Sequence, residues 1–264
     1  TTDDYAIGQP EGTIDPWLGS LALANGSQRI ATINTYATHP MSYYRTGRVS
    51  CDFPGLARNR RQQDDAQDVQ LYFSGAAGNV TAGKFNTGET ANRRLLTERL
   101  LDAMRAAAAE STRVAVDEWA FRSIPLELAP RTSPGFRLAD LEARIEQVDD
   151  PRDRNLAALG LSWRRRVEAA VPLDVPAIDF GAAQFLLLPA ESYVEYQLLA
   201  QRARSDVPVL VSGYGECGPG YIPTERAWQE RDANLGSWCW VAPGAESRMR
   251  RAIAAAVDSK LPDA

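Results

Sequence analysis

The chain has 264 residues, of which 44% are hydrophobic and 24% charged, and its formal net charge is −5 at pH 7. This length fits one large domain or two small ones. The basic residues are almost all arginines and are interspersed with acidic residues, which argues against a nucleic-acid partner. No apolar run approaches the roughly 20 residues that cross a bilayer, so the sequence predicts no membrane span.

Two β-strands are predicted near the start of the chain, over residues 17–24 and 28–38, joined by a tight Asn25-Gly26 turn. The second strand delivers His39, the single histidine of the chain, to a strand end that Pro40 closes. A short helix over residues 56–62 follows, with Pro54 in its first turn.

The next segments alternate between strand and helix. An apolar strand over residues 69–73 ends in the loop 75–81, and an amphipathic helix over residues 89–110, opened by Thr87, follows. This succession of strand, glycine loop and helix is typical of α/β proteins. Residues 113–129 then predict a long, partly exposed strand. Residues 138–148 and 152–170 predict a charged helical hairpin, which we interpret as an insertion or lid over residues 138–170.

The last third returns to apolar strands. Residues 183–189 predict a buried strand that breaks at Pro189, so that Glu191 is expected to begin a helix over residues 192–204. A strand over residues 207–212 leads into the glycine-rich loop 213–221, and a helix over residues 245–259 closes the domain. The predicted fold class is therefore α/β, a mixed β-sheet flanked by helices with a charged helical-hairpin insertion.

Four polar segments share one property, because each follows the carboxyl end of a predicted strand. They are the His39 loop, the loop 75–81, the turn at Glu191 and the loop 213–221. In α/β sheets this edge is where ligands bind. Each segment taken singly is also explained by ordinary turn chemistry. The loop 75–81 lacks the lysine of a P-loop and the spacing of a dinucleotide fingerprint, so neither nucleotide motif is predicted.

The few cysteines and the single histidine limit the chemistry. Cys51, Cys217 and Cys239 are odd in number and far apart, which predicts neither a disulfide framework nor a zinc-knuckle. One histidine cannot complete a histidine-rich metal site from this chain alone. A Ser-His-Asp triad would have to use His39, and no Gly-x-Ser-x-Gly elbow accompanies it.

Five short segments, taken together, indicate a protein family more specifically than any one of them does alone. They are Thr38-His39-Pro40, Asp52-Phe53-Pro54-Gly55, Gly75-Ala76-Ala77-Gly78-Asn79-Val80-Thr81, Leu188-Pro189-Ala190-Glu191 and Gly220-Tyr221-Ile222-Pro223-Thr224. In this order they resemble the neutral/alkaline (non-lysosomal) ceramidase family, and most closely its bacterial ceramidase-like branch. The resemblance extends over nearly the whole chain, with the charged hairpin as its least recognisable part.

The resemblance implies a zinc-dependent amidase, whose metal ligands map onto His39, Glu191 and Tyr221. Thr81 falls where the ceramidases carry a serine that is proposed to take part in amide cleavage. The amide groups around Gly78 and Asn79 are then expected to steady an oxyanion.

Asp52 is the carboxylate that we expect to orient the His39 imidazole behind the metal. The alternative for Asp52 is a helix N-terminal acid that favours the helix dipole. Glu191 and Tyr221 also have plainer explanations, as a helix N-terminal carboxylate and as a packed aromatic side chain before Pro223.

The sequence also departs from the family. An upstream His-Thr-His type segment, which carries the other zinc histidine, has no counterpart here, and the sequence after Thr224 lacks the family's Gly-Tyr-Glu segment. The resemblance therefore implies that residues 1–264 are the later part of a single catalytic domain whose N-terminal portion is missing, so that an upstream segment or a second chain completes the site.

Two functions follow as hypotheses. The first is a zinc-dependent hydrolase that cleaves an amide (N-acyl) bond of a small molecule or lipid by metal-activated water. The second is a non-catalytic remnant or binding module that retains the fold. The resemblance further implies export, to the periplasm or the outside of the cell.

Overall fold

The computed structural model describes residues 1–43, 46–216 and 218–259. The predicted hairpin is confirmed, because β1 (Gly19–Asn25) and β2 (Gln28–Tyr36) pair antiparallel. The turn between them places Gly26 at a φ of 54°, in the left-handed region that glycine adopts at no steric cost. β3 (Val69–Ser74) runs parallel to β2, so this sheet has the order β1-β2-β3.

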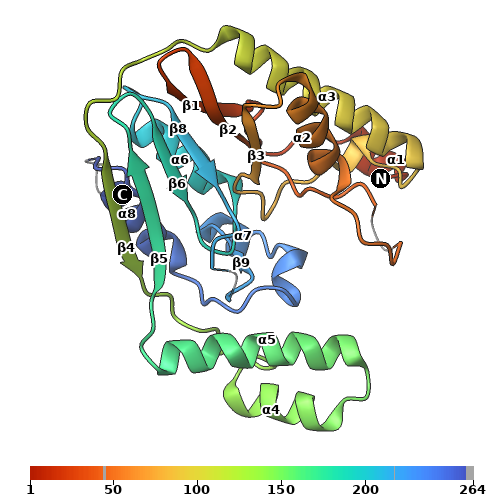
Figure 1. Cartoon of the computed structure of the whole chain (residues 1–264). Helices are drawn as coiled ribbons and strands as arrows, with labels where there is room; N and C mark the ends of the chain where they lie inside the picture. Colours follow the sequence, from red (N-terminus) through yellow and green to blue (C-terminus); the bar gives the residue numbers. More distant parts are fainter. Residues whose placement is uncertain (44–45, 217, 260–264) are drawn as a thin grey trace.

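A second sheet has the order β4-β5-β6-β8 and is also mixed (Figure 1). Its strands are β4 (Ala120–Leu126), β5 (Leu173–Asp179), β6 (Gln184–Leu187) and β8 (Val209–Ser212). β4 and β6 each pair antiparallel with β5, and β8 is parallel to β6. A short parallel ladder of β7 (Glu191–Ser192) and β9 (Tyr221–Ile222) stands apart. The mixed α/β fold is as predicted.

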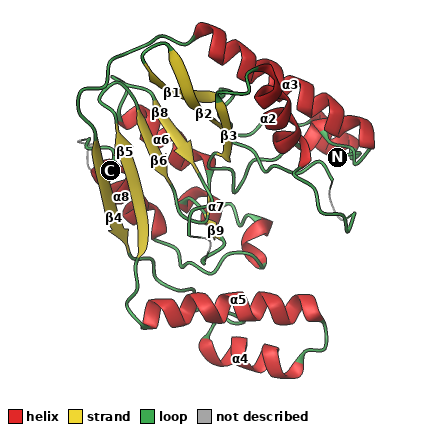
Figure 2. Ribbon diagram, in the orientation of Figure 1, coloured by secondary structure: helices red, strands yellow, loops and turns green. Residues whose placement is uncertain are grey.

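Helices cover one face of each sheet (Figure 2). α2 (Asp52–Asp64) and α3 (Thr90–Glu110) pack on the β1–β3 sheet, and α6 (Val194–Ala203) and α8 (Ala245–Ala256) pack on the second sheet. The short helical segments are α1 (Asp4–Gly8), η1 (Gly83–Phe85), α7 (Glu225–Gln229) and η2 (Ala233–Gly236). Within the described ranges, no helix is long and apolar enough to span a bilayer.

The predicted helical hairpin is α4 (Leu138–Gln147) and α5 (Pro151–Glu168), which pack on each other below the second sheet in Figure 1. Asp150 caps α5 by accepting the Arg152 N–H at 2.8 Å. Trp163 of α5 is buried in the main core, so the hairpin is anchored to the rest of the chain. A role as a lid stays a prediction.

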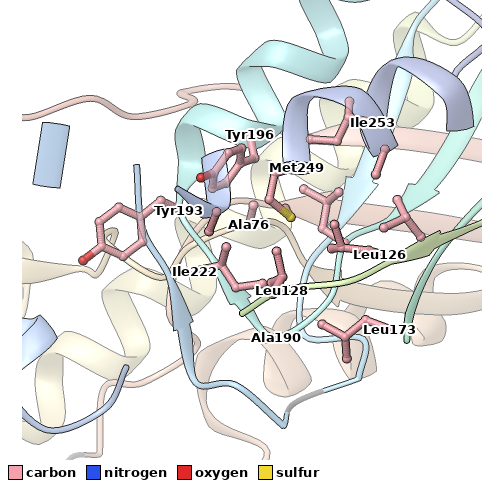
Figure 3. Close-up of a cluster of buried hydrophobic side chains, with 14 of the residues drawn as sticks. Ala76, Leu126, Leu128, Leu173, Ala190, Tyr193, Tyr196, Ile222, Met249 and Ile253 are labelled. Carbon is pink, nitrogen blue, oxygen red and sulfur yellow. The ribbon is translucent and has the colours of Figure 1, made fainter. Parts of the chain in front are cut away.

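The main hydrophobic core lies between the second sheet and helices α6 and α8 (Figure 3). Tyr196 and Met249 are almost completely buried in it, and the Tyr196 hydroxyl donates to the Pro223 carbonyl at 2.7 Å. Ala76 and Ala190, which lie in the loops after β3 and β6, belong to the same core. The loops that follow these strands are therefore fixed by packing.

Three predicted elements differ from the structure. Residues 112–119 have no strand partner and are exposed, so the long predicted strand is reduced to β4. β5 was not predicted, because Asp174 and Pro176 interrupt its apolar pattern. Glu191 does not begin a helix: it lies in β7, and α6 begins three residues later at Val194.

Candidate functional site

The loops that follow β2, β3 and β6 meet at one place, as the strand-end pattern predicted. The His39 N–H donates to the Val80 carbonyl at 2.9 Å, which joins the loop after β2 to the loop after β3. The Gly78 N–H donates to the Ser192 carbonyl at 3.0 Å, which joins the same loop to β7. These backbone hydrogen bonds bring His39 next to Glu191.

The loop after β8 reaches the same place. The Tyr214 N–H donates to the Ala190 carbonyl at 2.9 Å. Tyr214 and Ala190 have φ values of 61° and 51°, in the left-handed region that non-glycine residues seldom adopt. Such backbone strain is concentrated at functional sites in proteins. Part of the loop 213–221, Cys217, lies outside the described residues.

His39 and Glu191 are in direct contact although 152 residues separate them. His39 Nε2 lies 3.0 Å from Glu191 Oε2, and His39 Nδ1 lies 3.0 Å from the Val80 carbonyl oxygen. Because a carbonyl oxygen only accepts, Nδ1 carries a hydrogen and Nε2 is the atom that faces Glu191. Burial lowers the pKa of His39, but the hydrogen bonds to Glu191 and Val80 outweigh burial, so the pKa is raised overall.

Tyr221 stands beside Glu191 because β7 and β9 pair in register, with Glu191 opposite Tyr221. Side chains of paired residues leave the same face of a ladder. The Tyr221 ring lies edge-on to Tyr193, with 6.0 Å between ring centroids. Glu191 thus contacts His39 through its side chain and is paired with Tyr221 through the backbone of the β7–β9 ladder.

Two further side chains contact this group, and the sequence analysis missed both. The Trp238 indole N–H donates to Glu191 Oε1, the carboxylate oxygen that His39 does not contact. The Tyr214 ring lies edge-on to the His39 imidazole, with 5.8 Å between ring centroids. Tyr214 could have been found from the sequence, because the loop that contains it was predicted to reach the site. No sequence pattern indicates Trp238, which is 47 residues from Glu191.

Asp52 does not orient His39, so that prediction is wrong. The Asp52 carboxylate accepts the N–H groups of Ser42 and Tyr43, at 2.8 and 2.9 Å, and the Ser42 hydroxyl. Burial raises the pKa of Asp52, but these hydrogen bonds outweigh burial and lower it. Asp52 instead stands at the start of α2 and organises the segment before it, while the Val80 carbonyl holds the imidazole.

Asn79 has a structural role at the start of α6. Its Oδ1 accepts the Val194 N–H at 2.9 Å, and its Nδ2 donates to the Glu195 carboxylate at 3.0 Å. The first turn of α6 has no cap from its own N-cap residue, so Asn79 satisfies one of its unpaired N–H groups. The Asn79 side chain is therefore committed to structure.

Gly78 differs from what the oxyanion hypothesis needs, whereas the Thr81 hydroxyl is free to contact a substrate. The Gly78 N–H is used by the Ser192 carbonyl and so is not available to an oxyanion. Gly78 is packed so closely that an added Cβ would clash with the Glu191 carbonyl oxygen. Thr81 is exposed, and its hydroxyl makes no hydrogen bond to the part of the chain that the structure describes.

The donor chemistry at this site fits a zinc ion with open coordination positions. His39 Nε2 and a Glu191 oxygen are the nitrogen and carboxylate ligands that zinc takes, and the Tyr221 phenol is the third candidate. The fixed Nδ1–H of His39 is the usual second contact of a metal-binding imidazole. No group of three or more His, Cys, Asp and Glu side chains in the described residues is arranged to hold a metal.

The two cysteines within the described residues, Cys51 and Cys239, are not part of the site. Cys51 is exposed and Cys239 is buried, and both are free thiols. Burial raises the pKa of Cys239 to about 12, which leaves its thiol protonated and unreactive at neutral pH.

Solved ceramidases have the same fold. The neutral ceramidase from Pseudomonas aeruginosa matches 94% of the chain with a TM-score of 0.66 and 17% identity. A ceramidase complexed with C2 matches 95% of the chain with a TM-score of 0.67 and 15% identity. The matches cover 48% and 49% of those two chains, so this chain spans about half their length. No family model matches the sequence, and no curated protein does. The predicted likeness to bacterial neutral ceramidases is thus confirmed at the level of the fold.

Proposed function

We propose that this chain carries part of the active site of a zinc-dependent amidohydrolase, which cleaves an amide (N-acyl) bond. The fold supports a relationship to ceramidase-like hydrolases. The observation that carries the proposal is the contact between His39 Nε2 and Glu191 Oε2 at 3.0 Å, beside Tyr221 and at the edge where strand-end loops meet.

In this proposal His39, Glu191 and Tyr221 hold the metal. The Val80 carbonyl keeps the hydrogen of His39 on Nδ1, so the lone pair of the neutral imidazole is on Nε2. The Trp238 indole N–H fixes the Glu191 carboxylate from the other side. A zinc ion held by these residues would supply a Lewis acid for a substrate carbonyl and would lower the pKa of water to near 7.

The substrate carbonyl would be positioned by the loop after β3. The Thr81 hydroxyl is exposed and has no competing hydrogen bond within the described residues, so it is available to a substrate. The Gly78 N–H is not available, which leaves Thr81 as the better candidate in this loop. The names of the solved neighbours make ceramide the first lipid amide to test.

The first experiment measures bound zinc by elemental mass spectrometry after dialysis, in the wild-type chain and in His39→Ala. Near-stoichiometric zinc that is lost in His39→Ala is the expected result. Asp117→Ala is the control, because Asp117 is exposed and away from the site. Zinc that is retained in His39→Ala would contradict the proposed ligand set.

The second experiment measures the hydrolysis of N-acyl amides, ceramide included, by the product of the whole gene. Glu191→Gln preserves the shape of the side chain but weakens its metal binding, so turnover is expected to fall by a factor of about 100 or more. Unchanged turnover in Glu191→Gln would exclude the mechanism. Bound zinc without turnover of any amide would favour the non-catalytic binding module.

A further inference from the structure

A cleft of about 440 Å³ lies between the two larger sheets and helix α6. It lies where the edge strands β1 and β8 adjoin (Figure 1). Its volume is within the range of small-molecule sites, which is about 300–1,000 Å³. None of the residues that line the cleft is a proposed metal ligand, so the cleft is separate from the site described above.

The floor of the cleft is polar and buried. Asp15, Thr35 and Gln197 line it, and each of them is 3% exposed. The Thr35 hydroxyl makes no hydrogen bond to the part of the chain that the structure describes. Because buried polar groups are nearly always hydrogen-bonded, this hydroxyl calls for a partner inside the cleft.

Asp15 places a buried carboxylate in this floor without a cation beside it. The carboxylate accepts the side-chain amides of Gln197 and Gln201 at 2.6 and 2.8 Å, and the Trp17 backbone N–H at 3.1 Å. Within the described residues, these neutral groups are its hydrogen-bond partners. An aspartate is rarely buried unless a cation or metal pairs with it, so a cationic partner is the expected complement.

Arg204, which also lines the cleft, is committed to other partners. Its Nε and Nη2 donate to Asp206 at 2.9 and 3.0 Å, and its Nη1 donates to the Val257 carbonyl at 2.8 Å. The lining contains two acidic residues and one basic residue, so its net charge is −1. This charge favours a cationic ligand over an anionic one.

The rest of the lining fits an organic cation with a carbon chain. Trp17 is 78% exposed, and the face of an indole attracts ammonium groups. Leu18, Val209 and Leu210 supply apolar walls. The Gln201 side-chain carbonyl accepts no hydrogen bond from the described residues, so it is a further acceptor for N–H groups.

We propose that this cleft binds a primary alkylammonium ion. Its N–H groups contact Asp15 and the Thr35 hydroxyl, and its carbon chain lies between the Trp17 ring and the apolar walls. Primary alkylamines are protonated at neutral pH, as the lysine side chain is. The ligand therefore carries the charge that the buried carboxylate lacks beside it.

The cleft is connected to the loop after β3 through Gln197. Its Nε2 donates to Asp15 in the cleft, while its Oε1 accepts the Ala76 N–H at 2.9 Å. Hydrolysis of an amide adds water and releases a carboxylic acid and an amine. The amine product of the reaction proposed above thus belongs to the ligand class of the cleft, and this step alone rests on the proposed function.

The test measures the binding of n-hexylammonium to the product of the whole gene by isothermal titration calorimetry. Hexanol is the neutral analogue and hexanoate the anionic one. The variants are Asp15→Asn, which removes the charge, and Trp17→Ala, which removes the indole. Trp119→Ala is the matched control, because Trp119 is 69% exposed and does not line the cleft.

We expect n-hexylammonium to bind at least tenfold more tightly than hexanol or hexanoate. Asp15→Asn should weaken its binding at least tenfold, Trp17→Ala about two- to fivefold, and Trp119→Ala not at all. Circular dichroism melting checks the fold of Asp15→Asn. If that variant does not fold, the three ligands and the exposed Trp17 position still decide the question.

Equal affinity for n-hexylammonium and hexanol would overturn the proposal, as would binding that Trp17→Ala leaves unchanged or no measurable binding. The titration needs no turnover, so its outcome is independent of the catalytic proposal. A protein that binds n-hexylammonium in this way but hydrolyses no amide would support the cleft and contradict the proposed function alone.

Discussion

Trp238 and Glu191 are joined by a hydrogen bond from the indole N–H to Glu191 Oε1, while Glu191 Oε2 lies 3.0 Å from His39 Nε2. The carboxylate is therefore held from two sides. The Trp238 carbonyl also accepts the Tyr221 N–H at 2.8 Å. One residue outside the recognised motifs thus positions two of the three proposed metal ligands.

Replacing Trp238 by Phe should weaken zinc binding. Phenylalanine retains an aromatic ring against Trp240, with which Trp238 now packs at 5.4 Å between ring centroids, but it cannot donate to Glu191. Loss of a contact behind a metal ligand typically costs 10–100-fold in affinity, and we expect about this effect in zinc titrations against a chromophoric chelator. Trp17→Phe is the control, because Trp17 is 78% exposed. An unchanged affinity in Trp238→Phe would show that the indole does not position the ligand.

Replacing Gly78 by Ala should destabilise the fold and displace β7. The added methyl would meet the Glu191 carbonyl oxygen and the Tyr193 ring, and neither the backbone nor the buried ring can move freely. Overpacking of this kind costs about 1–3 kcal/mol in the free energy of unfolding, measured by urea denaturation. Gly12→Ala is the matched control, because nothing lies near its added Cβ. Equal stability of the two variants would mean that the loop after β3 yields easily.

Local patterns predicted the elements that depend on local chemistry. The Asn25-Gly26 turn between two strand-like segments identified the first hairpin, and the helix predicted over residues 152–170 matches α5 to within two residues at each end. The strand-end positions of His39 and of the loop 75–81 also predicted that these segments meet. Each of these signals lies within a few residues of the feature that it predicts.

Contacts between segments far apart in the chain could not be predicted from the sequence. β5 is recognisable only from its partners β4 and β6, because Asp174 and Pro176 break its apolar pattern. Glu191 was placed at a helix start because a proline precedes α6, whereas pairing with Tyr221 makes it a strand residue. The error about Asp52 has the same origin: its partners are the N–H groups of a neighbouring loop, which no spacing rule indicates.

Replacing Gln197 by Met should disturb the connection between α6 and the loop after β3. Gln197 Oε1 accepts the Ala76 N–H at 2.9 Å, and its Nε2 donates to the buried Asp15 carboxylate at 2.6 Å. Methionine leaves both partners with one hydrogen bond fewer, which costs about 1–3 kcal/mol for each buried group. Gln201→Met removes only a bond to Asp15, of 2.8 Å, and should cost less. Thermal melting of the two variants compares them, and the reverse order would contradict this role for Gln197.

Replacing Asp52 by Asn should change how stability depends on pH. Asp52 is 7% exposed, and its hydrogen bonds lower its pKa in the folded chain despite burial. The resulting stabilisation is complete above the pKa of the unfolded chain, about 3.9, and is lost as the pH falls through the lower pKa of the folded state. Asparagine places an N–H₂ group against N–H donors and does not titrate. We expect Asp52→Asn to lower the free energy of unfolding by about 1.5–3 kcal/mol at pH 7.

This difference between wild type and Asp52→Asn should shrink as the pH is lowered through the acid range, because the wild-type carboxylate then becomes protonated and loses its advantage. Urea unfolding at neutral, mildly acidic and strongly acidic pH measures it, with Asp117→Asn as the exposed control. A difference that stayed constant with pH would show that Asp52 acts through shape alone. Since Asp52 holds Ser42 and Tyr43 just beyond the His39 loop, acid should loosen this segment before it unfolds the sheets.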